Sequence, residues 1–206
     1  LFLSIVKELS ESGLPIYILL AGPRRHWLIH HLQKHNISFS YAGQVTAQDD
    51  YSLNLLSQDK IGELYHLIDV NLITSRWEGG PRCVLEGAAT RTKVVSPVIG
   101  MAPDILESRC LYDAVDSAVA ILYQDIKNDF LASTLDSQYS RFIADFIPRS
   151  NIPRFKELYQ HLEKIEPFGS KKIKASFLVS RNVLQRLQYG VKKKITGLYS
   201  KRTRNY

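Results

Sequence analysis

The stretch "VNLITSRWEGGPRCVLEGAATRTKVVSP" (residues 70–97) decides the predicted fold. It opens with a short apolar run over 70–74 and turns at Gly-Gly-Pro. It then continues to about Ala89 in a pattern typical of a helix. A second apolar run over 93–97 follows directly. A strand, a helix and a second strand joined by short connections predict a parallel β-α-β unit.

The same alternation extends toward the N-terminus. Helices are expected over 1–13, 24–36 and 60–68, strands over 16–22 and 37–43, and irregular structure over 46–57. In the helix over 24–36, Trp27, Leu28 and Leu32 are expected to face the core. Repeated β-α units predict an α/β, Rossmann-like fold, in which one parallel sheet carries helices on both faces.

The remainder of the chain is predicted to be helical and divides by charge. Helical pieces are expected over 102–108, 114–124, 128–145, 151–165 and 171–199, with a linker over 166–170. We therefore predict a domain over 1–166 and a basic tail over 167–206. From Phe168 to Tyr206 there are 11 Lys and Arg and no acidic residue, which leaves 27 − 11 = 16 basic and 20 acidic residues before it.

Such a tail predicts an anionic partner. Apolar side chains recur in it at helical spacing, and a basic amphipathic helix is typical of a membrane-surface anchor. A solvated basic terminus, or a helix that packs on another domain, is the alternative. Nucleic acid is not expected as a partner, because the body carries no recognised nucleic-acid motif.

Composition points to a protein of the cytoplasm that does not span a membrane. No apolar run in the 206 residues approaches the roughly 20 needed to span a bilayer. The N-terminal "LFLSIVKELSESG" lacks the basic region and cleavage site of a signal peptide. It also lacks an initiator Met, as expected for a fragment or a processed product. Two cysteines make no disulfide framework, so a reducing compartment is expected.

The loop and helix after the strand over 70–74 suggest a ligand. Gly79 and Gly80 let a ligand approach the backbone, and Pro81 opens a helix whose free N–H groups favour an anion such as phosphate. Glu78 and Glu86 flank this helix start and would repel phosphate, but carboxylates accept hydrogen bonds from hydroxyls. A nucleoside diphosphate sugar has hydroxyls on both sides of a diphosphate.

Several loops are expected to share one rim with these residues. Gly22, Gly43, the loop over 75–80 and the loop over 97–100 all follow predicted strands. In open α/β sheets ligands bind outside the carboxyl ends of the strands. Histidines at 26/30 and 31/35 have i,i+4 spacing, but without a third ligand in the pattern we expect no metal site.

The stretch "LYHLIDVNLITSRWEGGPRCVLEGAATRTKVVSPVIGMAPDIL" (64–106) resembles the donor-binding, C-terminal half of retaining glycosyltransferases of the GT-B fold (glycosyl transferases group 1). Upstream, "IYILLAGPRRHWLIHHLQ" and "ISFSYAGQV" resemble that family's strand–loop–helix and its next strand. The likeness extends over roughly 1–165. It implies a hexosyltransferase domain that binds a UDP- or GDP-sugar as substrate, without a metal or other cofactor.

The resemblance also implies roles for individual residues. Glu78 would be the catalytic residue and contact the donor sugar, Glu86 would bind the ribose hydroxyls, and the turn from Gly43 to Val45 would lie near the base. The remaining donor-binding residues would be Gly22, Arg24, Gly79, Gly80, Pro81 and Arg82.

Residues 1–206 depart from this family in three ways. The phosphate-binding "G-R…K-G" segment and the acceptor domain lie before the matching region, and Thr90-Arg91-Thr92 stands where glycine is usual. A separate N-terminal-half chain is therefore one expected partner. The acceptor would be a glycan or lipid-linked sugar in polysaccharide biosynthesis, at the inner face of the membrane. The alternatives are a non-catalytic nucleotide-sugar-binding domain and a peripheral membrane adaptor.

Overall fold

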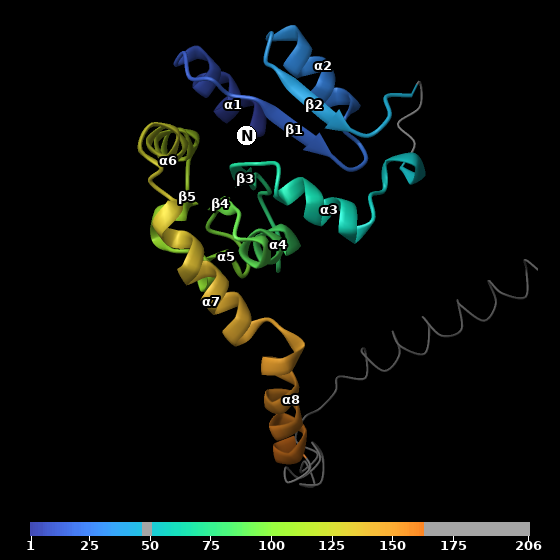
Figure 1. Cartoon of the computed structure of the whole chain (residues 1–206), viewed down its shortest axis with the longest axis vertical. Coiled ribbons are helices and arrows are strands. Elements are labelled where there is room, and N and C mark those ends of the chain that lie inside the picture. Colours follow the sequence, from blue (N-terminus) through green and yellow to red (C-terminus); the bar gives the residue numbers. More distant parts are fainter. Residues whose placement is uncertain (47–50, 163–206) are drawn as a thin grey trace, which may run out of the picture. The chain divides into compact units, whose positions relative to one another are not determined.

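The structure is a computed structural model that describes residues 1–46 and 51–162. The helices are α1 (Phe2–Glu11), α2 (His26–Lys34), α3 (Gln58–Tyr65), α4 (Arg82–Thr90), α5 (Ala102–Ile105), α6 (Val115–Asn128), α7 (Leu135–Asp145) and α8 (Pro148–Leu162) (Figure 1). The strands are β1 (Ile18–Ala21), β2 (Phe39–Ala42), β3 (Val70–Leu72), β4 (Lys93–Pro97) and β5 (Leu111–Tyr112). Short 3-10 turns cover Ser52–Asn54, Ser108–Cys110 and Ala132–Thr134.

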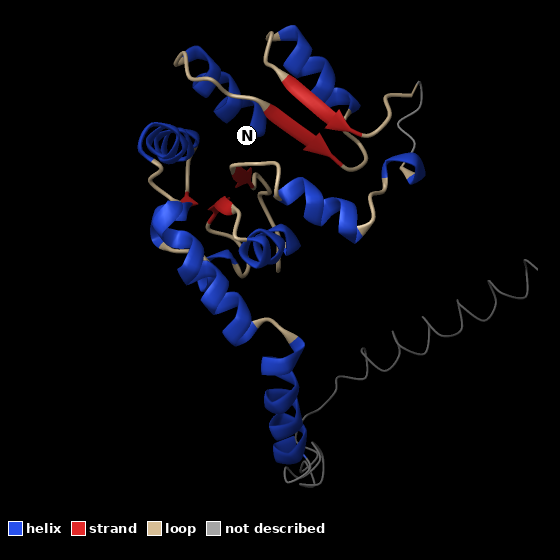
Figure 2. Cartoon of the chain, viewed as in Figure 1, coloured by secondary structure: helices blue, strands red, loops and turns tan. Residues whose placement is uncertain are grey.

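The strands form two parallel sheets, with the orders β1-β2 and β3-β4-β5 (Figure 2). The predicted α/β architecture of parallel strands and flanking helices is confirmed. The expectation of one continuous sheet is wrong, because no strand pairing joins β1 to β3 in the described part of the chain. Strand β5 escaped prediction because two residues are too few to set up a periodic pattern.

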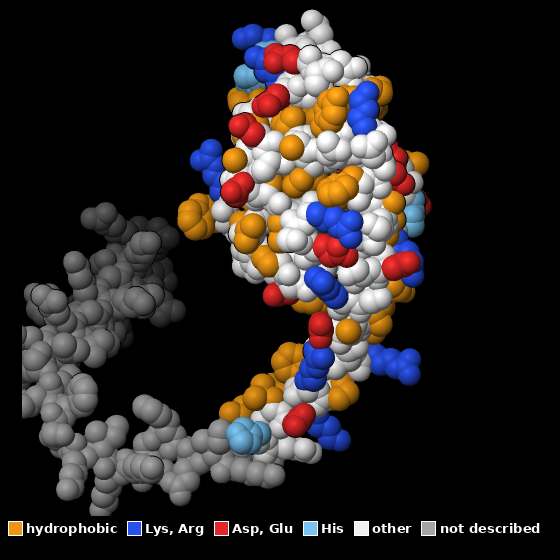
Figure 3. Space-filling model, turned by 90° about the vertical axis from the view of Figure 1, so that its left-hand side faces the viewer, with side chains coloured by type: hydrophobic (Ala, Val, Ile, Leu, Met, Phe, Trp, Pro, Cys, Tyr) orange, Lys and Arg blue, Asp and Glu red, His pale blue; other side chains and the backbone are white. Residues whose placement is uncertain are grey.

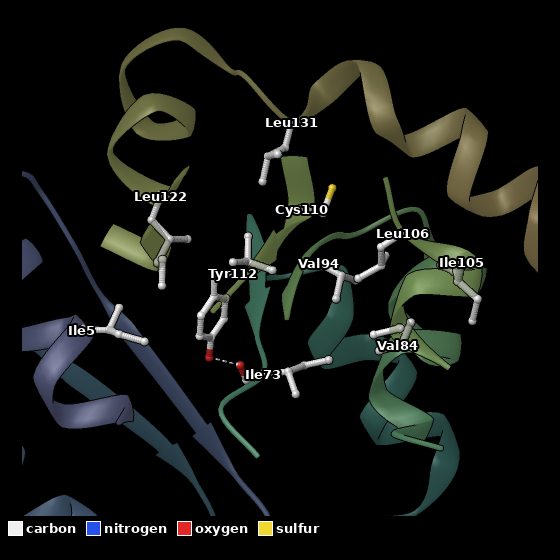
Figure 4. Packing of buried hydrophobic residues seen from close by; sticks show 14 of the residues in the cluster. Ile5, Ile73, Val84, Val94, Ile105, Leu106, Cys110, Tyr112, Leu122 and Leu131 are labelled. Atoms are coloured by element: carbon white, nitrogen blue, oxygen red, sulfur yellow. Dashed lines mark hydrogen bonds between the residues drawn. The ribbon is translucent and has the colours of Figure 1, made fainter. Parts of the chain in front are cut away.

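Each sheet has its own hydrophobic cluster. The larger cluster surrounds β3, β4 and β5 (Figure 4), and its fully buried side chains include Ile105, Leu131 and Val94. The smaller cluster surrounds β1 and β2 and is built on Val6, Leu20, Ile29, Leu32 and Ile37. Helix α1 contributes to both, since Ile5 and Leu9 join the larger cluster and Val6 joins the smaller one.

Polar contacts reinforce the larger cluster. The hydroxyl of Tyr112 donates to the carbonyl of Ile73 at 2.6 Å, which ties β5 to the end of β3 across β4 (Figure 4). The ammonium of Lys93, on β4, donates to both carboxylate oxygens of Asp125 at 3.0 and 2.9 Å. Burial lowers the pKa of Lys93, but hydrogen bonds and attraction to Asp129 and Asp125 outweigh it and raise the pKa.

The Thr90-Arg91-Thr92 turn closes α4 without glycine. Arg91 adopts the left-handed conformation at φ 56° and caps the helix. The Thr92 hydroxyl donates to the carbonyl of Tyr65 at 3.0 Å, and Gln138 donates to the carbonyl of Thr92 at 2.7 Å. These bonds to α3 and α7 hold the turn in a conformation that a non-glycine residue adopts only at some cost.

Two details of the predicted helices are corrected. Trp27 was expected to face the core but is 66% exposed. Ile29 is buried in its place. Pro81 is the cap of α4, and the helix itself begins at Arg82.

The contacts divide the chain into the units Leu1–Phe155 and Lys156–Tyr206. The predicted domain boundary at 166 and the basic tail over 167–206 lie outside the described residues. Among the described helices, none combines the length and apolar character that a membrane span requires.

Candidate functional site

Two loops meet at the carboxyl ends of β3 and β4. A Cβ atom at Gly100 would lie 2.5 Å from the carbonyl oxygen of Gly79 and 2.7 Å from that of Glu78. Gly100 also has φ 45°, a conformation that favours glycine. Only a residue without a side chain lets the loop over 97–100 lie directly against the loop that carries Glu78.

The Glu78 carboxylate is exposed and held by its own loop. The Ser75 hydroxyl donates to Oε1 of Glu78 at 2.5 Å. Trp77, next to it, is 91% exposed. At this exposure Trp77 is not a hydrophobic plug that fills the core beneath the loop.

The start of α4 presents backbone N–H groups toward this loop. Pro81 is buried and has no side-chain oxygen that could cap the helix. Its carbonyl accepts from the amide of Val84 at 3.0 Å, so in the first turn of α4 only the amides of Arg82 and Cys83 have no acceptor from Pro81. Gly80 precedes it, and a Cβ there would lie 2.7 Å from Cε of Met101. The amino end of a helix with this arrangement favours a negatively charged group.

Glu86 is positioned by a small polar network. The Tyr65 hydroxyl, from α3, donates to Oε2 of Glu86 at 3.1 Å. The amide of Asn71, on β3, donates to the carbonyl of Cys83 at 3.2 Å and lies 3.5 Å from the Tyr65 hydroxyl. Arg82 lies 3.7 Å from Oε1 of Glu86, whose side chain is 34% exposed. A carboxylate has about four lone-pair sites, so Glu86 can still accept hydrogen bonds from a ligand.

Burial fixes the protonation of the groups around Glu86. Burial, followed by the charges of Glu86 and Cys83, raises the pKa of Tyr65 well above its ordinary value. Tyr65 therefore remains a proton donor to Glu86 at neutral pH. Burial, followed by the charge of Glu78, raises the pKa of Cys83 to about 11. The thiol is therefore protonated at neutral pH, and it lacks the lowered pKa of a nucleophilic cysteine.

A cavity of about 610 Å³ reaches this network from the β1 side. Gly22, Arg25, Tyr65, Ser75 and Glu86 are among its lining residues. Of the donor-binding residues predicted from the sequence, the cavity brings together Gly22 and Glu86. The other predicted residues are absent from its described lining: Arg24, Gly43, Val45, Glu78, Gly79, Gly80, Pro81 and Arg82.

The arginine at the cavity differs from the predicted one. Arg25 lines the cavity and donates from Nε to the carbonyl of Ala21 at 3.0 Å. Arg24 lies instead over the ring of Tyr51, 5.6 Å from its centroid.

The turn after β2 is held by side chains from outside it. The buried Asn54 accepts from the amide of Gln44 at 2.7 Å and donates to its carbonyl at 3.1 Å. His26 Nε2 lies 2.9 Å from the carbonyl of Thr46. Gly43 and Val45 are exposed in this turn. The end of β2 pairs with the end of β1, so the turn lies at the same rim as Gly22.

The sequence patterns did not identify Tyr65 and Asn71 as members of the site, and they placed Ser75 only within a loop. Arg25 was one of three arginines, with Arg24 and Arg82, that could supply a positive charge near the rim. One signal was available: an amide at Asn71 inside the otherwise apolar run over 70–74 requires polar partners. Tyr65 gave no such signal, because its position on α3 is also a normal core position.

Comparison with solved structures identifies the architecture. The chain is similar to sucrose-phosphate synthase from Thermosynechococcus elongatus, a GT-B glycosyltransferase, with a TM-score of 0.58 and 15% sequence identity. The match covers 78% of this chain and 42% of that protein, so this chain spans less than half of its length. The fold is thus the Rossmann-like half of a GT-B architecture. No protein-family model matches the chain, and no curated protein matches it.

Proposed function

We propose that this chain is the donor-binding domain of a glycosyltransferase and binds a nucleoside diphosphate sugar at the rim of its strands. The observation that carries the proposal is Glu86. Its carboxylate borders a cavity, is oriented by Tyr65 and keeps acceptor sites for hydroxyl groups. It lies one helical turn beyond the amino end of α4, where a phosphate group is favoured.

In this proposal the ligand spans the rim with its diphosphate at the start of α4. Glu86 accepts hydrogen bonds from the ribose, and Glu78 accepts them from the donor sugar. Transfer requires positive groups that stabilise charge on the departing diphosphate. Arg25 is the best-placed candidate within the described residues, because Arg82 is engaged with Glu86.

Acceptor binding and membrane association are further parts of the proposal. The acceptor would be a glycan or a lipid-linked sugar, bound with the help of a polypeptide outside residues 1–206. The excess of basic residues after Phe168 favours docking at the cytoplasmic face of an anionic membrane, at about 1 kcal/mol for each Lys or Arg near the surface. Acidic and basic side chains are interspersed on the face of the described residues in Figure 3.

Calorimetric titration with UDP, GDP and their glucose and mannose conjugates tests donor binding. We expect at least one nucleotide to bind below millimolar concentration, and Glu86→Ala to weaken it about tenfold or more, since a hydrogen bond to a charged group contributes about 1.5–3 kcal/mol. Glu63→Ala is the matched control, because Glu63 is an exposed glutamate on α3. Equal affinities for the wild type and Glu86→Ala would contradict the proposal.

A further inference from the structure

Helix α8 carries its hydrophobic side chains on its surface. None of its residues over Pro148–Leu162 is buried. Its large hydrophobic side chains are between 48% and 65% exposed: Ile152, Phe155, Leu158, Tyr159 and Leu162. We call these side chains the α8 stripe. Contiguous exposed apolar surface of this kind marks a site of interaction.

The α8 stripe lies on one face of the helix. Each of its members has another member three or four positions away, which is the spacing of neighbours on a helix surface. With 3.6 residues per turn, the members span an arc of about 120°. Figure 3 shows hydrophobic side chains gathered along one side of α8. A stripe of this width is typical of a helix that buries one face against an apolar surface.

The hydrogen bonds that tie α8 to the preceding residues involve only its first turn. The Ser150 hydroxyl donates to the carbonyl of Ile143 at 2.6 Å, and the side-chain amide of Asn151 donates to the carbonyl of Asp145 at 2.8 Å. Pro153 lies inside the helix, where it lacks an N–H group and crowds the preceding turn. A helix of 15 residues is marginal in water unless its apolar face packs on something. The exposed α8 stripe therefore indicates that a partner surface supports this helix.

Positive side chains border the α8 stripe on both sides. By helical geometry Arg149 and Lys156 lie beside one edge of the stripe, and Arg154 lies beside the other. All three are exposed, and Arg154 also pairs with Asp145 at 2.8 Å. The acidic Glu157 lies on the opposite face. An anionic surface suits this arrangement, because long cationic side chains reach phosphate groups beside a buried apolar face.

The sequence after α8 favours the same kind of partner. From Phe168 to Tyr206 the chain has 11 Lys and Arg and no acidic residue. Basic residues in such numbers are attracted to the surface of an anionic membrane. The stripe itself includes Tyr159, and tyrosine is enriched at the boundary between lipid headgroups and acyl chains.

A coiled coil with a second copy of the chain fits the stripe less well. Four of its members have the spacing of two heptads: Ile152, Phe155, Tyr159 and Leu162. The next two positions of this repeat are Glu166 and Gly169, which end the apolar seam. A coiled coil is indicated by about three or four heptads or more, so this repeat is too short.

We propose that α8 lies in the surface of an anionic phospholipid membrane, with the α8 stripe at the boundary between headgroups and acyl chains. Arg149, Arg154 and Lys156 extend to the lipid phosphates, and the basic residues after Phe168 attract the same surface. The helix lies along the membrane and does not cross it, in keeping with its exposed polar face. This inference extends the membrane association proposed above by naming the element that enters the lipid. It does not depend on donor binding.

Vesicle sedimentation of residues 1–206 tests the α8 stripe, with vesicles of phosphatidylglycerol and phosphatidylcholine in equal amounts. Phe155→Ser combined with Leu162→Ser should lower the partition coefficient about tenfold or more, because two apolar side chains no longer enter the lipid. Gln160→Ser combined with His161→Ser is the matched control on the polar face and should change it less than about twofold. Both double variants should unfold thermally like the wild type, because α8 has no buried side chain.

Hydrogen exchange reports on the helix itself. On addition of the vesicles, the amides over 154–162 should exchange about tenfold or more slowly in the wild type and in the control variant. The variant with Phe155→Ser and Leu162→Ser should show no such change, although its basic residues after Phe168 are intact. Nucleotide titration is a separate measurement on the same proteins, so loss of vesicle binding and loss of donor binding can be told apart.

Three outcomes would overturn the proposal. Equal partitioning of the wild type and of the variant with Phe155→Ser and Leu162→Ser would assign vesicle binding to the basic residues alone. Slow exchange of the α8 amides in dilute protein without vesicles would mean that another part of the chain covers the stripe. Protection that rises with protein concentration in the absence of vesicles would assign the stripe to a second copy.

Discussion

The two sheets of this molecule differ in how completely they are built. The half around β3, β4 and β5 has a large buried cluster, a hydrogen bond from Tyr112 that links its outer strands, and a buried ion pair. The half around β1 and β2 has two strands and a small cluster. Isolated two-stranded β-structure is marginally stable at best, so this half depends on packing against α1 and α2. We infer that the larger half carries the stability of the domain and that the smaller half opens first.

Asp125→Ala should produce the largest effect on this comparison. Its side chain is 3% exposed and pairs with Lys93, which is 14% exposed. Asp125 also accepts from the amide of Leu131 at 2.8 Å. The substitution leaves the buried Lys93 ammonium without this partner. It should lower the free energy of unfolding, measured with urea, by about 3–5 kcal/mol.

Asp129→Asn is the control. Asp129 contacts the same lysine with a side chain that is 70% exposed, and we expect a loss below about 1 kcal/mol. Equal losses would argue against a buried pair.

Truncating one leucine in each half compares the two clusters directly. Leu131 and Leu32 are both fully buried, so each change to alanine should cost about 2–5 kcal/mol locally. Leu131→Ala should accelerate hydrogen exchange throughout the domain. Leu32→Ala should accelerate exchange in β1 and β2 and leave β4 protected. If Leu32→Ala exposed β4 to the same extent, the two halves would unfold as one unit and the comparison would fail.

Gly87→Ala tests the close approach of α4 to β4. A Cβ at Gly87 would lie 2.4 Å from Cγ2 of Val94, which is fully buried and has little room to move. We expect a loss of about 1–3 kcal/mol in the free energy of unfolding. Gly62→Ala is the matched control, because a Cβ there meets nothing within 4 Å and α3 should gain about 0.5–1 kcal/mol. A neutral Gly87→Ala would show that the helix can shift away from the strand.

The smallest effect is a pH dependence at Cys83. Burial raises the pKa of the folded Cys83 thiol from its ordinary value to about 11. The contribution of the protonated Cys83 thiol to the free energy of unfolding is therefore complete below about pH 9, and it is lost as the pH rises toward 11. Near pH 8, alkylation by iodoacetamide in a Cys110→Ala background should be about 100-fold slower than for a free cysteine, in line with the smaller thiolate fraction. If Cys83 were alkylated as fast as a free cysteine, its thiol would not be buried.

Sequence patterns predicted the elements that have enough residues to show a period. The β-α alternation from β1 to β4 and the loop from Ser75 to Gly80 follow from short apolar runs, Gly-Gly-Pro and helical spacing. The separation into two sheets could not be predicted this way, because pairing between β1 and β3 depends on backbone edges that carry no sequence signal.

The site was predictable in part for a similar reason. Glu78 and Glu86 stood out because carboxylates around a glycine turn suggest a ligand. The hydrogen bond from Tyr65 to Glu86 joins two helices across 21 positions of sequence, and only the folded chain reveals it. Trp27 was misplaced because the three consecutive apolar residues 27–29 allow more than one choice of buried face.

The most direct test of the donor-site account asks whether Glu86 binds ribose hydroxyls. Affinity would be measured by calorimetry for the tighter of UDP and GDP and for its 2′,3′-dideoxy analogue, with the wild type and with Glu86→Gln. Loss of the hydroxyls should weaken binding to the wild type about tenfold or more, and binding to Glu86→Gln much less, because the partner carboxylate is already gone. Equal loss in both proteins would contradict the assignment of Glu86 and, with it, the central claim.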